Sequence, residues 1–331
     1  MKRSNFLKTV ASAALPGFAY SFTRPGHATL TRPKRLKEGD RIGLVAPAGI
    51  IYDDEEFDRM QEALGSMGLI PVMGRNVKKR YGYLAGTDRE RAGDINIMFA
   101  DAKIDGIMAV RGGWGCARIL PYLNFKMIAR NPKVYCGFSD NTTLHHAFMA
   151  YCGLQTFHGP NGNSEWTDLT RSSFQSVIMQ GENAEYRSVS KVETLYPGKA
   201  EGRLVGGNLS ILTTTLGTNY QANYSGAILF VEDIGENSYK IDRMLTHLKQ
   251  AGVLDNIKGF IFGRCTDCSS GSSPTFSLRE TLENHICPLK IPAVMGMDIG
   301  HDDDNFTIPS GGYAVIDADE TNLRLSESAV V

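Results

Sequence analysis

The pattern of hydrophobic and polar positions predicts strands that alternate with helices over the first half of the chain. Short apolar runs bounded by turn residues are typical of buried strands, whereas apolar residues three and four positions apart indicate helices. By these criteria a first strand begins at Arg41, further strands cover residues 69–73, 106–110 and 133–136, and helices cover residues 54–67, 87–100 and 141–150. This alternation favours a parallel sheet that is covered by helices on both faces.

The second half of the chain has a more mixed pattern. A strand, a glycine turn and a helix follow Glu201, and residues 240–251 have the spacing of an amphipathic helix. The remaining apolar runs predict strands at residues 227–231, 258–263, 293–296, 313–316 and 323–325. We therefore expect an α/β protein in which an N-terminal parallel α/β, Rossmann-like domain precedes a smaller mixed α/β, β-barrel-like C-terminal domain.

Length and composition agree with two globular domains. The chain has 331 residues, of which 42% are hydrophobic and 21% charged, as in ordinary globular proteins. We place the N-terminal domain at residues 31–165 and the C-terminal domain at residues 201–331. The segment 166–200 is polar and weakly periodic, and we assign it to the connection between the domains.

The first 30 residues have the layout of an export signal. The basic residues Lys2, Arg3 and Lys8 precede a weakly apolar run at residues 9–20 that ends in small residues. This run is too short to span a bilayer. Ser4 stands where a twin-arginine signal has its second arginine, so the export route stays open. We expect the protein in the periplasm or at the cell surface; a disordered tail on a cytoplasmic protein is the alternative.

Net charge and cysteine spacing argue against several kinds of partner. The formal net charge of -1 provides no general attraction to nucleic acid or to anionic lipid, so we expect no nucleic-acid partner. Cys265 and Cys268 have C-x-x-C spacing, but no second pair with ligand spacing follows, which argues against zinc. We expect no metal or organic cofactor, and a local disulfide between Cys265 and Cys268 stays open for an exported protein.

Ser139 lies on the turn between a predicted strand and a predicted helix. Gly137 permits a tight bend before it, and the helix that begins at Asn141 presents backbone N–H groups that favour developing negative charge. This is the layout of a nucleophile elbow. The familiar pattern G-x-S-x-G is matched only in part, because Asn141 replaces the second glycine. The alternative is a serine that only caps the helix.

A glycine-rich stretch follows the strand at residues 106–110. Residues 111–118 read Arg-Gly-Gly-Trp-Gly-Cys-Ala-Arg, and their glycines let backbone amides approach a ligand closely. The spacing differs from that of nucleotide-binding glycine loops. Because this stretch and Ser139 follow strands of one parallel sheet, we expect an oxyanion-binding loop beside the serine.

A serine nucleophile needs a base, and few of the seven histidines qualify. His145 and His146 follow Ser139 on one helix, which carries them away from its tip. His158 ends a strand and remains a candidate for lining the site. His301 lies in a loop after an apolar strand, a common place for a catalytic histidine.

Glu232 is the candidate for the acid that orients the histidine. It ends a strongly apolar strand, where a carboxylate is either paired or functional. A salt bridge to Lys240 or Arg243 is the structural alternative. Asp233 and Glu236 compete for the same role.

Seven motifs together resemble the LD-carboxypeptidases, the serine peptidase family that also contains the microcin C immunity peptidases. They occur in the family's order from about Arg41 to the C-terminus, and each is weak alone. The motifs are Arg111-Gly-Gly-Trp-Gly, Gly137-Phe-Ser-Asp, Thr156-Phe-His-Gly-Pro, Gly206-Gly-Asn-Leu, Glu232-Asp, Tyr239-Lys-Ile-Asp-Arg-Met-Leu and Gly300-His.

The resemblance implies a catalytic triad of Ser139, Glu232 and His301. It also implies an oxyanion hole made by the backbone N–H groups of Gly113 and Asp140. The implied reaction is hydrolysis of the bond between the L-centre of a diamino acid and a terminal D-alanine in a peptidoglycan tetrapeptide. A peptide–nucleotide antibiotic as substrate, or peptidoglycan binding without catalysis, are the alternatives. Family members are commonly homodimers, so we expect a homodimer.

Substrate preference is less defined than the triad. Arg111 or Asn208 is our candidate for binding the substrate carboxylate, and Trp114 is a further substrate-binding candidate. Trp114 stands where the family usually has tyrosine, and Asn141 stands where an aliphatic residue is common. The acidic run at residues 302–304 is unusual for the family.

Overall fold

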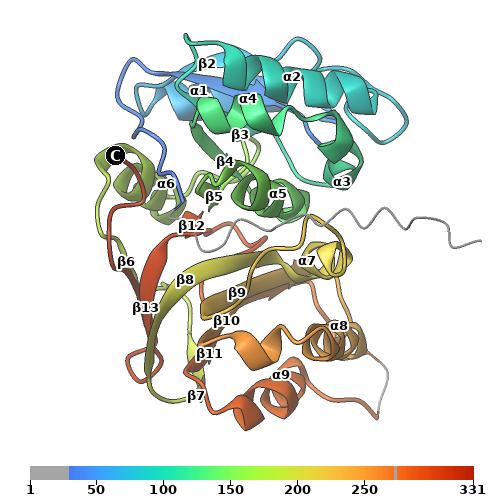
Figure 1. The fold of residues 1–331 in the computed structure, drawn as a ribbon, viewed down its shortest axis with the longest axis vertical. Coiled ribbons are helices and arrows are strands. Elements are labelled where there is room, and N and C mark those ends of the chain that lie inside the picture. The colour runs from blue at the N-terminus through green and yellow to red at the C-terminus, as the bar shows by residue number, and fades with distance from the viewer. Residues whose placement is uncertain (1–29, 272–273) are drawn as a thin grey trace, which may run out of the picture.

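The computed structural model describes residues 30–271 and 274–331 (Figure 1). These residues form two β-sheets, each flanked by helices, with the N-terminal half above the C-terminal half in this view. The predicted α/β class, with a parallel N-terminal sheet and a mixed second sheet, is confirmed. The predicted export signal lies outside the described residues, apart from residue 30.

The first sheet carries the residues that precede the predicted nucleophile and the glycine-rich stretch. Its strands are β1 (Arg41–Val45), β2 (Ile70–Met73), β3 (Gly106–Ala109), β4 (Val134–Gly137), β5 (Thr156–His158) and β12 (Ile308–Ser310). The strand order is β12-β5-β4-β3-β1-β2, and only β12 is antiparallel to its neighbour. Since β3 and β4 are adjacent and parallel, the loops that follow them lie side by side at one edge.

Helices cover both faces of the first sheet, as the alternating pattern predicts. They are α1 (Glu55–Gly65), α2 (Asp88–Ala100), α3 (Cys116–Ile119), α4 (Phe125–Arg130), α5 (Thr142–Cys152) and α6 (Asp168–Phe174). Phe57 of α1 packs in one buried cluster with Leu44, whereas Phe99 of α2 and Phe148 of α5 belong to another cluster with Val45. Neighbouring positions of β1 thus point to opposite faces, which is the period of a strand.

The second sheet contains eight strands. They are β6 (Glu185–Tyr186), β7 (Glu193–Tyr196), β8 (Lys199–Asn208), β9 (Ala227–Ile234), β10 (Gly259–Thr266), β11 (Ala293–Met295), β13 (Tyr313–Asp317) and β14 (Asn322–Leu325). The order is β6-β14-β13-β8-β9-β10-β11-β7, with β8 to β11 parallel and the outer pairs antiparallel. One face is covered by α7 (Leu209–Thr215), α8 (Ser238–Gln250) and α9 (Leu278–Ile286).

The two sheets share a hydrophobic core. Phe230 of β9 and Ile261 of β10 lie in the same buried cluster as Met108 of β3 and Phe157 of β5. The second sheet is therefore held against the first sheet.

Two segments cross between the halves. The segment 166–200, which we expected to be a connection, contains α6, a π-helical turn (Gln175–Gln180), and β6 and β7 at the two ends of the second sheet. Conversely, β12 comes from the C-terminal half but extends the first sheet through β5. These edge strands have only two to four residues, which is too short for a strand period to show, and this is why the pattern alone does not predict them.

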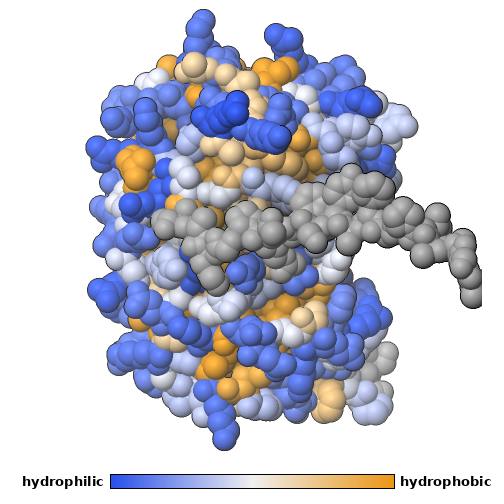
Figure 2. Space-filling view, in the orientation of Figure 1, coloured by the Kyte–Doolittle hydropathy of each residue, from blue (hydrophilic) through white to orange (hydrophobic). Residues whose placement is uncertain are grey.

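The surface in Figure 2 is mostly hydrophilic, with apolar residues interspersed in separate patches, as expected of a surface that faces water. Across residues 30–271 and 274–331, we find no helix with the length and apolarity needed to cross a bilayer.

Candidate active site

Ser139 lies on a strained turn between β4 and α5. It begins a short 3-10 helical turn (Ser139–Asn141), and its φ of 65° is in the left-handed region that non-glycine residues rarely adopt. A Cβ atom placed on Gly112 would lie 2.7 Å from Ser139 Cβ and 2.9 Å from Ser139 Oγ. The serine hydroxyl is therefore pressed against the glycine-rich loop, which tolerates it only because residue 112 has no side chain.

Asn141, the departure from the G-x-S-x-G pattern, braces this turn. Its side-chain amide donates to Phe138 O at 3.0 Å, and its Oδ1 accepts from Tyr135 Oη at 2.7 Å. Asn141 is fully buried. It therefore supports the strained conformation from inside the protein, where the family's aliphatic residue would only fill space.

The glycine-rich loop and the serine turn are tied to each other through Asp140. Its Oδ2 accepts from Cys116 N at 2.7 Å, at the start of α3. Burial raises the pKa of the Asp140 carboxyl. Across the described part of the chain, the backbone N–H groups of Gly113 and Asp140 donate no hydrogen bond. They are thus the unpaired donors that an oxyanion hole requires.

Arg91 of α2 supports the glycine-rich loop through hydrogen bonds to backbone oxygens, a role that the sequence did not suggest. Its guanidinium is buried and donates to Gly115 O at 2.9 Å, to Asp88 Oδ1 at 2.6 Å and to Pro47 O. An arginine on an amphipathic helix is ordinarily solvent-exposed. Nothing in the local sequence of α2 marks Arg91 as a buried loop support.

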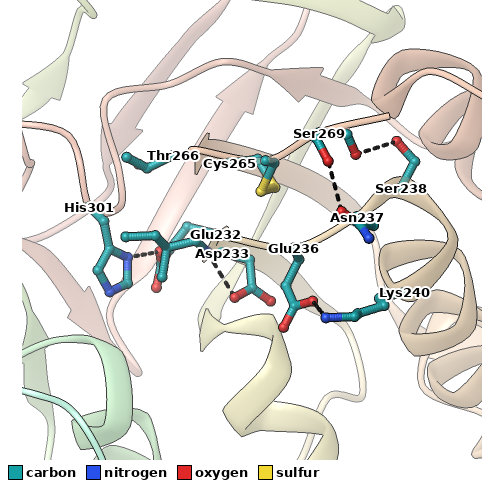
Figure 3. Close-up of a disulfide and its surroundings, with 12 residues drawn as sticks. Glu232, Asp233, Glu236, Asn237, Ser238, Lys240, Cys265, Thr266, Ser269 and His301 are labelled. Carbon is teal, nitrogen blue, oxygen red and sulfur yellow. Dashed lines mark hydrogen bonds and ion pairs between the residues drawn. A yellow bond between two sulfur atoms is a disulfide. The ribbon is translucent and has the colours of Figure 1, made fainter. Parts of the chain in front are cut away.

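His301 and Glu232 form a buried hydrogen-bonded pair (Figure 3). Glu232 Oε2 lies 2.7 Å from His301 Nδ1; the glutamate side chain is 0% and the histidine side chain 14% exposed. Burial lowers the pKa of His301, but the charge and hydrogen bond of Glu232 outweigh it and leave this pKa above its usual value. The carboxylate thus holds the imidazole in one orientation and favours its charged form.

Neighbouring contacts distinguish Glu232 from Asp233 and Glu236. Lys240 was one of the alternative salt-bridge partners of Glu232. It instead forms an ion pair with Glu236 at 2.8 Å. Asp233 accepts from Asn208 and Ser210, and burial together with the charge of Glu232 raises its pKa to about 6. Among these three carboxylates, Glu232 is the one bonded to a histidine.

The histidine lies next to the serine turn. The His301 ring packs edge-on against the ring of Phe138, the residue before Ser139, with centroids 4.8 Å apart. Within the described residues, no hydrogen bond joins Ser139 Oγ to His301. In free enzymes this bond is often long and tightens when substrate binds.

Three further histidines, His145, His146 and His158, are buried beside the serine turn or the second sheet, and none of them is hydrogen-bonded to Ser139 among the described residues. His145 pairs with Gly137 O and Thr156 Oγ1, and His146 pairs with Gly206 O. Burial lowers the pKa of His145 and of His146 to about 4 each. His158 is also buried, and its ring packs edge-on against that of Phe138. These three rings therefore stay neutral near pH 7.

The three substrate-binding candidates differ in how exposed their side chains are and in whether those side chains already have hydrogen-bond partners. Arg111 donates to Ile50 O at 2.7 Å. Asn208 is buried; its Oδ1 accepts from Ile211 N at the start of α7, and its Nδ2 donates to Asp233. Trp114 is 64% exposed, and its ring lies edge-on to that of Tyr83 at a 6.0 Å centroid distance. Trp114 is the candidate most accessible to a ligand.

The C-x-x-C pair forms a disulfide between Cys265 and Cys268. In residues 30–271 and 274–331, no group of three or more ligating side chains is arranged to hold a metal ion. Among the free cysteines, Cys116 and Cys136 are buried, whereas Cys152 is partly exposed.

Comparison with known proteins identifies the class of this site. The LD-carboxypeptidase N-terminal domain family matches residues 42–159, and the LD-carboxypeptidase C-terminal domain family matches residues 201–316. A probable murein peptide carboxypeptidase of Bacillus subtilis is 38% identical over 297 residues, which cover 87% of this chain and 92% of the relative.

Two solved structures share the fold. The structure of MccF in complex with glutamyl sulfamoyl guanosine has a TM-score of 0.84 and 26% identity, covering 92% of this chain and all (100%) of the other. Muramoyltetrapeptide carboxypeptidase from Oxalobacter formigenes has a TM-score of 0.76 and 28% identity, covering 86% of this chain and 97% of the other. Fold and relatives define a serine-type carboxypeptidase. The chain belongs to the LD-carboxypeptidase family, as its motifs indicated.

Proposed function

We propose that this protein hydrolyses the bond between the L-centre of a diamino acid and the terminal D-alanine of a peptidoglycan tetrapeptide, through an acyl-enzyme on Ser139. The observation that carries the proposal is the buried His301–Glu232 pair beside a strained serine turn. Its support from relatives is their naming as murein peptide and muramoyltetrapeptide carboxypeptidases.

The mechanism assigns one task to each group. His301 accepts the proton of Ser139 as its Oγ attacks the peptide carbonyl, and Glu232 stabilises the charged imidazole. The backbone N–H groups of Gly113 and Asp140 bind the tetrahedral oxyanion, and loss of one such donor typically costs about 10² to 10³ in rate. His301 then protonates the leaving amine of D-alanine, and water releases the shortened peptide from the acyl-enzyme.

Release of free D-alanine from an L-Ala–D-Glu–diaminopimelate–D-Ala tetrapeptide tests this proposal. The protein lacking residues 1–30 is compared with its Ser139→Ala variant, for which a loss of about 10⁶ in turnover is expected. Ser172→Ala, a substitution at a serine on α6, serves as the matched control. A tetrapeptide that ends in L-alanine tests the stereochemistry. Equal release by the wild type and the Ser139→Ala variant would remove Ser139 from the mechanism.

A peptide–nucleotide antibiotic is the second candidate substrate. It is favoured by the structural likeness to MccF, which was solved with glutamyl sulfamoyl guanosine. The same preparation incubated with that compound, with release of glutamate measured, separates the two. A non-catalytic peptidoglycan-binding protein would neither release a product nor react at Ser139 with a fluorophosphonate.

We further propose that the protein is exported and forms a homodimer. The basic and apolar layout of residues 1–30 supports export, and so does the Cys265–Cys268 disulfide, because disulfides persist mainly in oxidising compartments. Mass determination of the N-terminus of the protein recovered from periplasm and cytoplasm tests export. Light scattering of the purified protein tests the dimer, which rests on the family resemblance.

A further inference from the structure

The disulfide lies at the end of β10, beside the strand β9 that carries Glu232 (Figure 3). In the register of β9 and β10, Cys265 pairs with Asp233, one residue beyond Glu232. The register shifts between Phe262 and Cys265, so β10 leaves its regular path just before the disulfide. An irregular strand end of this kind needs other contacts to hold its position.

Both neighbours of Cys265 bind the residue that follows His301. Thr266 Oγ1 donates to Asp302 Oδ1 at 2.7 Å, and Arg264 Nε lies 3.5 Å from Asp302 Oδ2. Asp302 is thus held from two sides by residues whose backbone flanks the cross-link. The first residue of the acidic run therefore has a defined structural contact, and it lies next to the catalytic histidine.

Arg264 also anchors the start of the same loop. Its Nη2 donates to Asp298 Oδ1 at 2.6 Å, and its backbone N–H donates to Ile299 O at 2.8 Å. Asp298 is 1% exposed and accepts from Val189 N as well. The loop from Asp298 to Asp302 is therefore attached to β10 on both sides of His301.

The other end of the cross-linked turn holds the segment that follows Glu232. Gly235 N donates to Thr266 O at 2.8 Å, and Ser269 N donates to Glu236 O at 3.1 Å. Ser238 N, at the start of α8, donates to Ser269 O at 3.0 Å. One short turn thus contacts both segments whose side chains form the His301–Glu232 pair.

We propose that the Cys265–Cys268 disulfide is a positioning element for the His301–Glu232 pair, and that the peptidase works at full rate only while this bond is intact. The proposal rests on the proposed function of the same site. Reduction by a dithiol breaks the S–S bond, converts both cysteines to thiols and oxidises the dithiol to its own disulfide. The turn then loses its cross-link, and its hold on Asp302 loosens.

The effect falls on turnover because the imidazole moves and the serine does not. A displacement of about 1 Å in catalytic geometry costs about 10²-fold in rate. We expect kcat to fall by about 10- to 100-fold on reduction, with KM nearly unchanged, since none of the hydrogen bonds that attach the His301 loop to β10 involves Arg111, Trp114 or Asn208.

The purified full chain is assayed for D-alanine release in its oxidised form and after treatment with dithiothreitol. The double variant Cys265→Ser/Cys268→Ser is measured beside it and is expected to match the reduced protein and to be insensitive to dithiothreitol. Cys287→Ser, a substitution at a free cysteine, controls for the other thiols and should leave the response intact. Reoxidation of the reduced wild type should restore the rate.

The pH profile separates positioning from general destabilisation. The titratable and charged groups around His301 are Glu232 and Asp233 of β9, His158 of β5, and Asp302 with its partner Arg264. The carboxylates raise the pKa of His301 against the effect of burial. If Glu232 is less well placed after reduction, this pKa falls, and the acid limb of kcat/KM shifts to lower pH.

Labelling of Ser139 by a fluorophosphonate gives a readout that needs no wall peptide. If D-alanine is not released but labelling slows on reduction, the proposed substrate fails and the positioning role stands. Equal labelling rates and equal acid limbs for the oxidised and reduced proteins would overturn the positioning role. Should the double variant unfold, Thr266→Val decides: it removes the Asp302 contact alone, and an unchanged kcat and acid limb would again overturn the proposal.

Discussion

Replacement of Glu232 by glutamine tests the central interaction of the site with little change in volume. The carboxylate is 0% exposed and lies 2.7 Å from His301 Nδ1, so solvent does not screen the pair. At an effective dielectric constant of about 20, unit charges about 4 Å apart interact by about 4 kcal/mol, which corresponds to about 10³ in rate. The corresponding change in a Ser-His-Asp peptidase costs about 10⁴. We therefore expect kcat to fall by roughly 10³ to 10⁴.

The pH dependence of kcat/KM should also change in a defined direction. The base works only as the neutral imidazole, so kcat/KM rises with pH through the pKa of His301, which Glu232 holds above its usual value. Without the carboxylate, burial lowers that pKa, and the acid limb of Glu232→Gln moves to lower pH. Because the pKa of His301 is higher in the folded than in the unfolded protein, its ionisation stabilises the fold at pH values below the unfolded pKa of about 6.5. This stabilisation is lost as the pH rises through the folded-state pKa. The variant should lose more Tm at about pH 5.5 than at about pH 9.

Steady-state release of D-alanine across pH, with Tm measured on the same samples, is the assay. Glu236→Gln is the matched control, because its ion pair with Lys240 is partly exposed, and its kcat should change by less than about five-fold. A Glu232→Gln enzyme with wild-type kcat and an unshifted acid limb would refute the role of Glu232.

Three further substitutions test the fold and the serine turn. Gly112→Ala places a Cβ atom 2.7 Å from Ser139 Cβ, so the tetrapeptide assay should show a loss of at least about 10² in kcat. Gly93→Ala lies in α2, where an added Cβ meets nothing within 4 Å; denaturant unfolding should show a gain of about 0.5–1 kcal/mol, and a loss would refute the open-space reasoning. Phe230→Ala opens the core between the sheets at a fully buried side chain and should cost about 3–5 kcal/mol in the same unfolding experiment; a cost below about 1 kcal/mol would mean that the core collapses around it.

The sequence alone was sufficient for the order of the main elements. Helical and strand periodicities are local properties, and the segments that became α1 and α8 bury one stripe of residues, which periodicity detects. It also identified the serine turn, because a strand followed by a glycine, a serine and a helix is a local pattern. The family motifs extended this to the partners of Ser139, as expectations.

The tertiary structure decided which distant groups meet. Glu232 and His301 are 69 positions apart, and sequence gave no means to prefer Glu232 over Asp233 or Glu236 except the family pattern. The choice follows from pairing of β9 with β10 and from the attachment of the His301 loop to Arg264 and Thr266. These are non-local contacts between polar residues, which leave no periodic trace in the chain.

Non-local contacts also explain two features that the sequence did not predict, the burial of Arg91 and the position of β12. Arg91 lies on a helix with no marked apolar face, and only the packing of α2 against the glycine-rich loop buries its charge among carbonyl oxygens. β12 is three residues long, and its pairing with β5 rather than with the second sheet depends on where the chain crosses between the halves. Local sequence therefore determined the elements and the serine turn, and long-range packing determined which polar groups are brought together beside that turn.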